Sequence, residues 1–180
     1  MHPQRLALDT CVVSEFAKPR PNQGCLNLLN ARPPFEFAMP FPVYAEIQVG
    51  INIKRIDGNK NWKAHLRWLN LVMAAGMELL SPTEHTAAIY AKMITTPQLK
   101  QFWFMNPNSS RVQPEQDLLI AAIAISHNCP LATMNVKDFM LINKFFPLPG
   151  LLQPKMGWLV KPTDPVSPIS AVTDPPTFHH

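Results

Sequence analysis

Residues 5–13 read RLALDTCVV, and this stretch is the first unit of the predicted fold. Residues 6–8 form a short apolar run of the kind that fills a buried parallel strand. Asp9 ends that run, and residues 10–17 can form a helix that stops before Pro19. A buried strand followed at once by a helix is typical of an α/β protein.

The rest of the chain continues this alternation of apolar runs and helical segments. The expected elements are a short strand within residues 35–43, helices over residues 43–50, 59–75, 81–94 and 114–128, and a strand over residues 131–133. Pro40 and Pro42 limit the first of these strands to a short or edge-like piece. Ser81 is expected to cap the helix that follows it, with Glu84 as the capping-box partner. The order of elements predicts an α/β fold with a mostly parallel sheet.

The composition is that of a folded domain of ordinary size. Of the 180 residues, 47% are hydrophobic and only 16% are charged, which supplies a core and too little charge for a disordered chain. No apolar stretch approaches the roughly 18 residues that cross a bilayer, so we expect no membrane association. The formal net charge of +4 is compatible with a polyanionic partner.

Cysteine usage indicates a reducing compartment. The three cysteines, Cys11, Cys25 and Cys129, lie far apart and form no CxxC pair. This spacing disfavours both a disulfide framework and a structural zinc site. We therefore expect a cytoplasmic protein.

Two polar, proline-bearing segments fall outside the pattern of strands and helices. Residues 95–113 are expected to form a long loop or lid. Beyond about residue 160 the composition changes to Pro, Ser, Thr and Asp, which cannot bury enough apolar surface to fold. We therefore expect one domain over residues 1–160 and a proline-rich tail over residues 161–180 that is disordered or forms a strap that docks onto a partner.

Acidic residues are scarce, so their positions are informative. Of the twelve, four lie beside the most apolar segments: Asp9, Glu46, Asp117 and Asp138. A carboxylate near a core is costly to desolvate unless a partner compensates it. Asp9 and the pair Asn135 and Asp138 follow predicted strands, and open α/β sheets bind ligands at the carboxyl ends of their strands. Oxygen ligands without His or Cys select a hard cation, Mg²⁺ or Mn²⁺, over Zn²⁺.

Each of these acids also has an ordinary structural interpretation. Asp9 could cap the helix that follows it, and Asp138 could cap a last helix. Asp117 could be a first-turn acid that the helix dipole favours, and Glu46 could be a surface residue of its helix. Spacing alone leaves the metal site and these interpretations open.

Four short motifs follow one another along the chain: LALDTCVVSE at residues 6–15, AEI with a following Gly-Ile at residues 45–51, DLLIAAIA at residues 117–124, and Thr-x-Asn-x-x-Asp-Phe at residues 133–139. In order and spacing they resemble the motifs of the PIN-domain family, and in particular of its VapC-type toxins. The resemblance covers about residues 6–158. Cys11 stands where the family usually has Asn, and Met134 stands where it usually has Arg.

This resemblance implies a PIN-like α/β/α sandwich that gathers the acids into one pocket. Members are usually Mg²⁺- or Mn²⁺-dependent ribonucleases, commonly dimeric and inhibited by a cognate antitoxin. By the same resemblance, Asp9, Glu46 and Asp117 would be metal-binding catalytic residues, and Asp138 with Asn135 would complete the pocket. The resemblance thus implies a toxin-type endoribonuclease that hydrolyses RNA phosphodiester bonds, with an antitoxin partner and a homodimeric state. A catalytically weak or inactive PIN-like module that binds RNA or a protein is the alternative.

Overall fold

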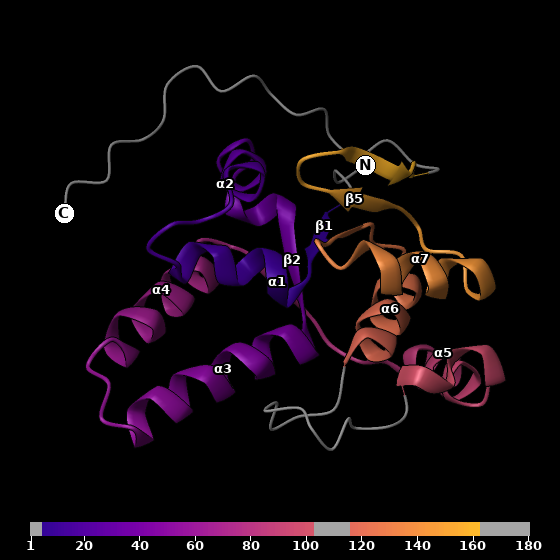
Figure 1. The fold of residues 1–180 in the computed structure, drawn as a ribbon, viewed down its shortest axis with the longest axis horizontal. Helices are drawn as coiled ribbons and strands as arrows, with labels where there is room; N and C mark the ends of the chain where they lie inside the picture. Colours follow the sequence, from indigo (N-terminus) through magenta and orange to yellow (C-terminus); the bar gives the residue numbers. More distant parts are fainter. Residues whose placement is uncertain (1–4, 103–115, 163–180) are drawn as a thin grey trace.

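A central sheet of six strands organises the computed structural model, which describes residues 5–102 and 116–162 (Figure 1). The strands are β1 (Leu6–Leu8), β2 (Phe37–Pro40), β3 (Glu78–Leu80), β4 (Leu131–Ala132), β5 (Leu151–Gln153) and β6 (Gly157–Val160). Their order across the sheet is β3-β2-β1-β4-β5-β6, and every pair is parallel except β5 with β6. The predicted mostly parallel sheet is therefore confirmed.

Helices connect the strands and flank the sheet (Figure 1). The α-helices are α1 (Thr10–Val13), α2 (Gln23–Asn30), α3 (Phe41–Ile56), α4 (Trp62–Ala74), α5 (Glu84–Ile94), α6 (Asp117–Ser126) and α7 (Val136–Phe145), and the 3₁₀ helices are η1 (Ser14–Ala17), η2 (Pro34–Glu36) and η3 (Pro97–Phe102). Helices α3 and α4 pack together as a hairpin, and α6 contacts both α5 and strand β2. The expected α/β/α arrangement is confirmed. Across the two described ranges, no helix is both long and apolar enough to pass through a bilayer.

The middle of the sheet is completely buried. All residues of β1 and β4 are inaccessible to solvent. Helix α6 buries residues 120–124 in the same core. A parallel strand that is covered on both faces needs an unbroken apolar sequence, and residues 6–8 supply one.

Two prolines lie at a strand–helix junction and not in an edge strand. Strand β2 pairs with β1 on one side and β3 on the other, so it is an inner strand. It has only four residues, which confirms the prediction of a short or edge-like piece by its first alternative. Pro40 ends the strand and Pro42 lies in the first turn of α3, where helical N–H groups have no intrahelical acceptor. Helix α3 also continues past its predicted end at Gly50, because Ile51 is buried and anchors the next turn.

The two helices after α3 are confirmed with shorter bounds. Helix α5 begins later than expected because Thr83, and not Ser81, is its cap. The Thr83 hydroxyl accepts a hydrogen bond from the N–H of Thr86 at 3.1 Å, and the Thr86 hydroxyl accepts one from the N–H of Thr83 at 3.0 Å. Thr86 therefore takes the capping-box position that was expected of Glu84.

Part of the expected loop after α5 is helical. Helix η3 buries Leu99 and Phe102, which explains why this polar segment begins with regular structure. The rest of the predicted lid, residues 103–113, lies outside the described residues, and so does most of the predicted tail, residues 163–180. Strands β3, β5 and β6 and helix α2 are additional to the predicted elements.

Candidate active site at the ends of β1 and β4

Asp9 stands directly after β1 and is only 5% exposed. Its backbone N–H donates to the carbonyl of Ala132 at 3.0 Å, which holds it beside the end of β4. One carboxylate oxygen, Oδ1, accepts from the N–H of Thr10 at 2.6 Å, so Asp9 does cap α1. The other oxygen, Oδ2, accepts from the Thr133 hydroxyl at 2.6 Å and from the Cys11 thiol at 2.9 Å. Capping therefore uses only one oxygen of this carboxylate.

Thr133 connects Asp9 to Asp117 by way of Asn135. The Thr133 hydroxyl is fully buried, and besides donating to Asp9 it accepts from the N–H of Asn135 at 2.9 Å. The side chain of Asn135 donates through Nδ2 to Oδ2 of Asp117 at 2.8 Å. Asp117, in the first turn of α6, is thereby held next to the segment that leaves β4. The two acids and the amide belong to one hydrogen-bonded chain.

Glu46 reaches the same region from α3. The Thr10 hydroxyl donates to Oε2 of Glu46 at 2.5 Å, and the N–H of the same residue donates to Asp9. Glu46 lies in the second turn of α3 and is half-buried. The structure therefore brings Asp9, Glu46 and Asp117 to one edge of the sheet, where Thr10, Thr133 and Asn135 link them.

Asp138 is placed differently from these three acids. It lies in the first turn of α7 and is half-buried. Asn135, and not Asp138, occupies the N-cap position of that helix, so the capping interpretation of Asp138 was wrong. The Asp138 side chain takes no part in the hydrogen bonds that link the other acids.

The donor chemistry of this edge fits a hard cation. Its donor atoms are carboxylate oxygens from three elements and the amide oxygen of Asn135, the ligands that Mg²⁺ and Mn²⁺ prefer. Within the described part of the chain, no three His, Cys, Asp or Glu side chains stand together as a ready-made metal site. The carboxylates are held by protein donors instead, and each carboxylate has lone pairs for more than one partner. The residues therefore fit the ion by donor type.

Cys11 lies between Asp9 and the segment that leaves β4. Its thiol donates to Asp9, and its sulfur accepts from the N–H of Met134 at 3.2 Å. Burial, and after it the neighbouring Asp9 carboxylate, raises the pKa of the Cys11 thiol to about 12, so the thiol is protonated at neutral pH. The sulfur thus donates one hydrogen bond and accepts another, as a side-chain amide at this position would.

Three residues that support the site were absent from the predicted set. Thr10 and Thr133 stand inside the four motifs. A hydroxyl directly after Asp9 was the signal available for Thr10, whereas Thr133 has no acid next to it in the sequence. Glu15 is the third, since its nearly buried carboxylate accepts from Lys18 Nζ at 2.5 Å and from the N–H of Asn22 at 2.6 Å. The hydrogen bond from Lys18 is the main cause that lowers the pKa of Glu15. This contact ties η1 to the start of α2 and so steadies the segment after β1.

Comparisons with known proteins match this chain over most of its length. The chain is 30% identical over 135 residues to Ribonuclease VapC1 of Haemophilus influenzae (strain R2866), an alignment that covers 75% of this chain and 90% of that protein. The solved structure of VapBC-1 from nontypeable Haemophilus influenzae is similar with a TM-score of 0.57 and 26% identity, covering 83% of this chain and 98% of that chain. VapBC-5 from Mycobacterium tuberculosis, a member of the VapBC family of toxin–antitoxin systems, shares the fold with a TM-score of 0.54 and 22% identity, covering 84% of this chain and 99% of that chain.

The family profile of the PIN domain matches residues 6–140. That range contains β1, β4 and all four acids of the predicted site. The match covers more than half of the chain, and the sheet and helices agree with the fold of the similar solved structures. This chain therefore belongs to the PIN domain family.

Proposed function

We propose that this chain is a metal-dependent endoribonuclease, the toxin of a toxin–antitoxin pair, with its active site at the ends of β1 and β4. The observation that carries the proposal is the set of hydrogen bonds that links Asp9, Glu46 and Asp117 around one edge of the sheet. The similar protein from Haemophilus influenzae is named a ribonuclease, and the family match spans these acids.

A hard divalent ion, Mg²⁺ or Mn²⁺, would be held by oxygen ligands from this edge. The proposed ligands are Asp9, Glu46 and Asp117, with Asn135 and Asp138 completing the pocket. When bound, such an ion neutralises the phosphate and makes a water molecule more acidic.

The chain's own contribution is to hold the carboxylates in place before the ion and the RNA arrive. Thr133 fixes Asp9, Thr10 fixes Glu46, and Asn135 donates to Asp117. Because neighbouring hydrogen bonds orient metal ligands, their loss weakens metal binding and activity together. The hydrolysis of a phosphodiester also needs the acidic edge to be neutralised, since carboxylates repel the RNA backbone.

Positive side chains are needed to attract RNA to an acidic edge. Lys137 is exposed beside Asp138 in the first turn of α7, and Lys18 is exposed where η1 ends. Arg20 and Arg55 are further exposed candidates. Contacts of this kind make RNA affinity fall as the salt concentration rises.

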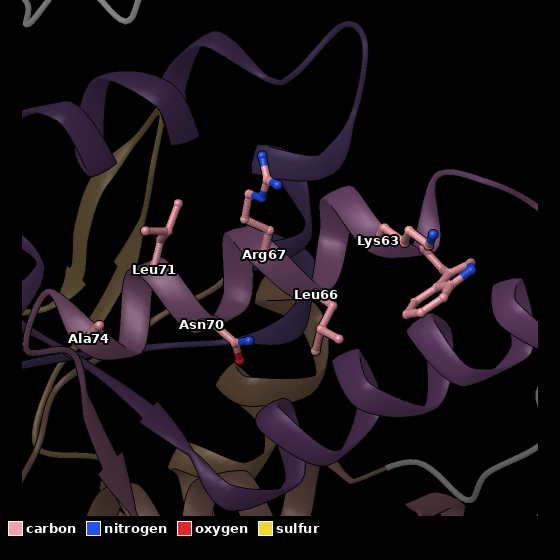
Figure 2. Close-up of a pocket in the computed structure, with 7 residues that line it drawn as sticks. Lys63, Leu66, Arg67, Asn70, Leu71 and Ala74 are labelled. Atoms are coloured by element: carbon pink, nitrogen blue, oxygen red, sulfur yellow. The ribbon is translucent and has the colours of Figure 1, made fainter.

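We also propose that the antitoxin binds along α4. An open groove of about 560 Å³ lies on this helix. Figure 2 draws the residues that line it: Trp62, Lys63, Leu66, Arg67, Asn70, Leu71 and Ala74. Leu71 is 62% exposed, and Lys63 and Arg67 add positive charge to a mainly apolar lining. The groove suits a segment that carries apolar and acidic side chains.

Two further features of the proposed toxin are its assembly and its compartment. We propose that it forms a homodimer, which sedimentation analysis of the purified chain would show. Free thiols at Cys11, Cys25 and Cys129 are suited to the reducing cytoplasm, where we propose that the protein acts.

RNA cleavage by the purified full-length chain tests the proposed function. We expect cleavage with Mg²⁺ or Mn²⁺, none after chelation, and a fall to background for Asp9→Asn, Glu46→Gln and Asp117→Asn. Glu84→Gln is the control, because Glu84 is an exposed acid in the first turn of α5. The proposal is overturned if the chain cleaves no RNA with either ion and if Asp9→Asn leaves growth inhibition in cells unchanged.

The lack of a ready-made group of three ligands among the described residues favours one second candidate, a PIN-like module that binds RNA or a protein without cleaving it. Calorimetry separates the two. The non-catalytic module would take up no Mg²⁺ or Mn²⁺ and still bind its partner. A binding heat for Mn²⁺ that disappears in Asp9→Asn would exclude it.

A further inference from the structure

Asp9 is the most buried of the three linked acids, so its orientation depends on the donors around it. Its Oδ2 atom lies 2.6 Å from the Thr133 hydroxyl and 2.9 Å from the Cys11 sulfur. A carboxylate supplies no hydrogen, so the contact with sulfur is a donation from the thiol. Two donors from different segments of the chain therefore fix this oxygen.

Cys11 is held on its other side as well. The N–H of Met134 donates to the Cys11 sulfur at 3.2 Å, and the Met134 side chain accepts from the Cys25 thiol at 3.5 Å. The Cys11 sulfur therefore joins the first turn of α1 to the segment that follows β4. Because the Cys11 sulfur is hydrogen-bonded to the Met134 N–H as well as to Asp9, its position helps to fix the Asp9 carboxylate.

We propose that Cys11 is a positioning residue whose thiol orients the Asp9 carboxylate for the divalent ion. The inference rests on the proposed function, since it takes Asp9 as a metal ligand. It identifies a role for a residue that departs from the usual family motif, in which Asn occupies this position. A thiol can take this role because it donates and accepts at once, although more weakly than an amide or a hydroxyl.

Removing the sulfur leaves Oδ2 of Asp9 with Thr133 as its remaining side-chain donor and leaves the Met134 N–H without its acceptor. Changes to groups that orient metal ligands typically weaken metal binding about 10- to 100-fold. Because the thiol is a weak donor and Thr133 remains, we expect the lower end of this range, about 10-fold weaker Mn²⁺ binding in Cys11→Ala. Cys11→Ser restores a donor and an acceptor and should recover most of the loss.

Calorimetric titration of the full-length chain with Mn²⁺ tests the inference. Cys129→Ala is the matched control, because Cys129 is also a buried thiol but donates to the backbone carbonyl of Arg5 at 3.1 Å and not to a carboxylate. Thermal unfolding of each variant shows that the binding constants refer to folded protein. The expected result is weaker binding in Cys11→Ala, recovery in Cys11→Ser and no change in Cys129→Ala.

The S–H stretching band in the infrared spectrum gives a second readout that needs no metal and no activity. The band of Cys11 is the one that disappears in Cys11→Ala, or in Cys11→Ser if the Ala variant does not fold. We expect this band to move to higher frequency in Asp9→Ala, because the thiol loses its acceptor.

The outcomes separate this inference from the proposed function. Wild-type affinity in Cys11→Ala, an equal loss in Cys129→Ala, or an unshifted S–H band would overturn the inference and leave the proposed function intact. A wild-type chain that binds no Mn²⁺ would overturn the metal-dependent function and this inference with it.

Discussion

The hydroxyl of Thr133 links Asp9 to the backbone of Asn135, and replacing Thr133 by Val tests this link. Val keeps the shape of the side chain and removes the hydrogen bond donated to Asp9 and the one accepted from the N–H of Asn135, together with the 3.5 Å contact between the hydroxyl and the Cys11 sulfur. A hydrogen bond to a charged group contributes about 1.5–3 kcal/mol, and a neutral one about 1 kcal/mol. Because Thr133 is fully buried, solvent does not replace them. We expect Thr133→Val to lower the free energy of unfolding by about 3 kcal/mol.

Urea unfolding followed by circular dichroism measures this loss, as a lower midpoint with an unchanged slope. Thr133→Ser is the matched control, since it keeps the hydroxyl and loses one methyl group, worth about 1 kcal/mol. A double-mutant cycle with Asp9→Asn isolates the part of the loss that comes from the contact between the two side chains. If Thr133→Val proved as stable as Thr133→Ser, the hydroxyl would not be holding the acid, and the reasoning about the hydrogen-bonded site would be refuted.

Three further predictions concern the parts of the chain that support the site. Lys18 lowers the pKa of the Glu15 carboxylate in the folded chain, so this carboxylate contributes stability above its unfolded pKa and loses it as the pH falls through its folded pKa. Glu15→Gln should therefore be less stable than wild type at neutral pH and approach it in acid, in thermal unfolding scans across pH; a constant difference would contradict this. Gly50→Ala should raise the free energy of unfolding by about 1 kcal/mol in urea unfolding, because alanine favours the helix more than glycine does. A Cβ added at this position in the middle of α3 meets no atom within 4 Å. A loss of stability would show that the helix is constrained at this turn. Leu8→Ala, in fully buried β1, should lower the free energy of unfolding by about 2–5 kcal/mol in the same assay. Leu71→Ala, at a residue that is 62% exposed, should change it by less than about 0.5 kcal/mol. Equal losses in the two variants would contradict the burial of Leu8 and the exposure of Leu71.

The parts of the fold that could be predicted from sequence are those in which an apolar stretch of sequence is also buried in the folded chain. Strand β1 is apolar and buried throughout, and helix α6 is apolar from Leu118 to Ile125 and buried at most of these positions. Strand β3 shows the opposite case, since Glu78 and Leu79 are exposed and only its pairing with β2 makes it a strand. Helix α3 passes Gly50 because burial of Ile51 outweighs the helix-breaking tendency of the glycine. Pairing and burial are properties of the whole chain, so a local pattern does not contain them.

The acids of the site could be predicted because they lie beside the most apolar segments of the sequence, but the hydroxyl of Thr133, which donates a hydrogen bond to Asp9, could not. Strands β1 and β4 pair with Leu8 opposite Ala132, and this register places the next residues, Asp9 and Thr133, side by side. The hydrogen bond between these two residues therefore depends on a strand register between segments far apart in the sequence. No spacing rule within either motif specifies that register.

The topology of the sheet explains why the acids meet at this edge. From β1 the chain crosses to β2 on one side, and from β4 it crosses to β5 on the other, so the connections leave these neighbouring strands in opposite directions. In open α/β sheets a crevice forms at such a point, outside the carboxyl ends of the two strands. Asp9 follows β1 and Thr133 follows β4, so the hydrogen bond between them lies at the point where the connections diverge. Between β2 and β3 the successive connections run in the same direction, and the same acids placed there would find no such opening.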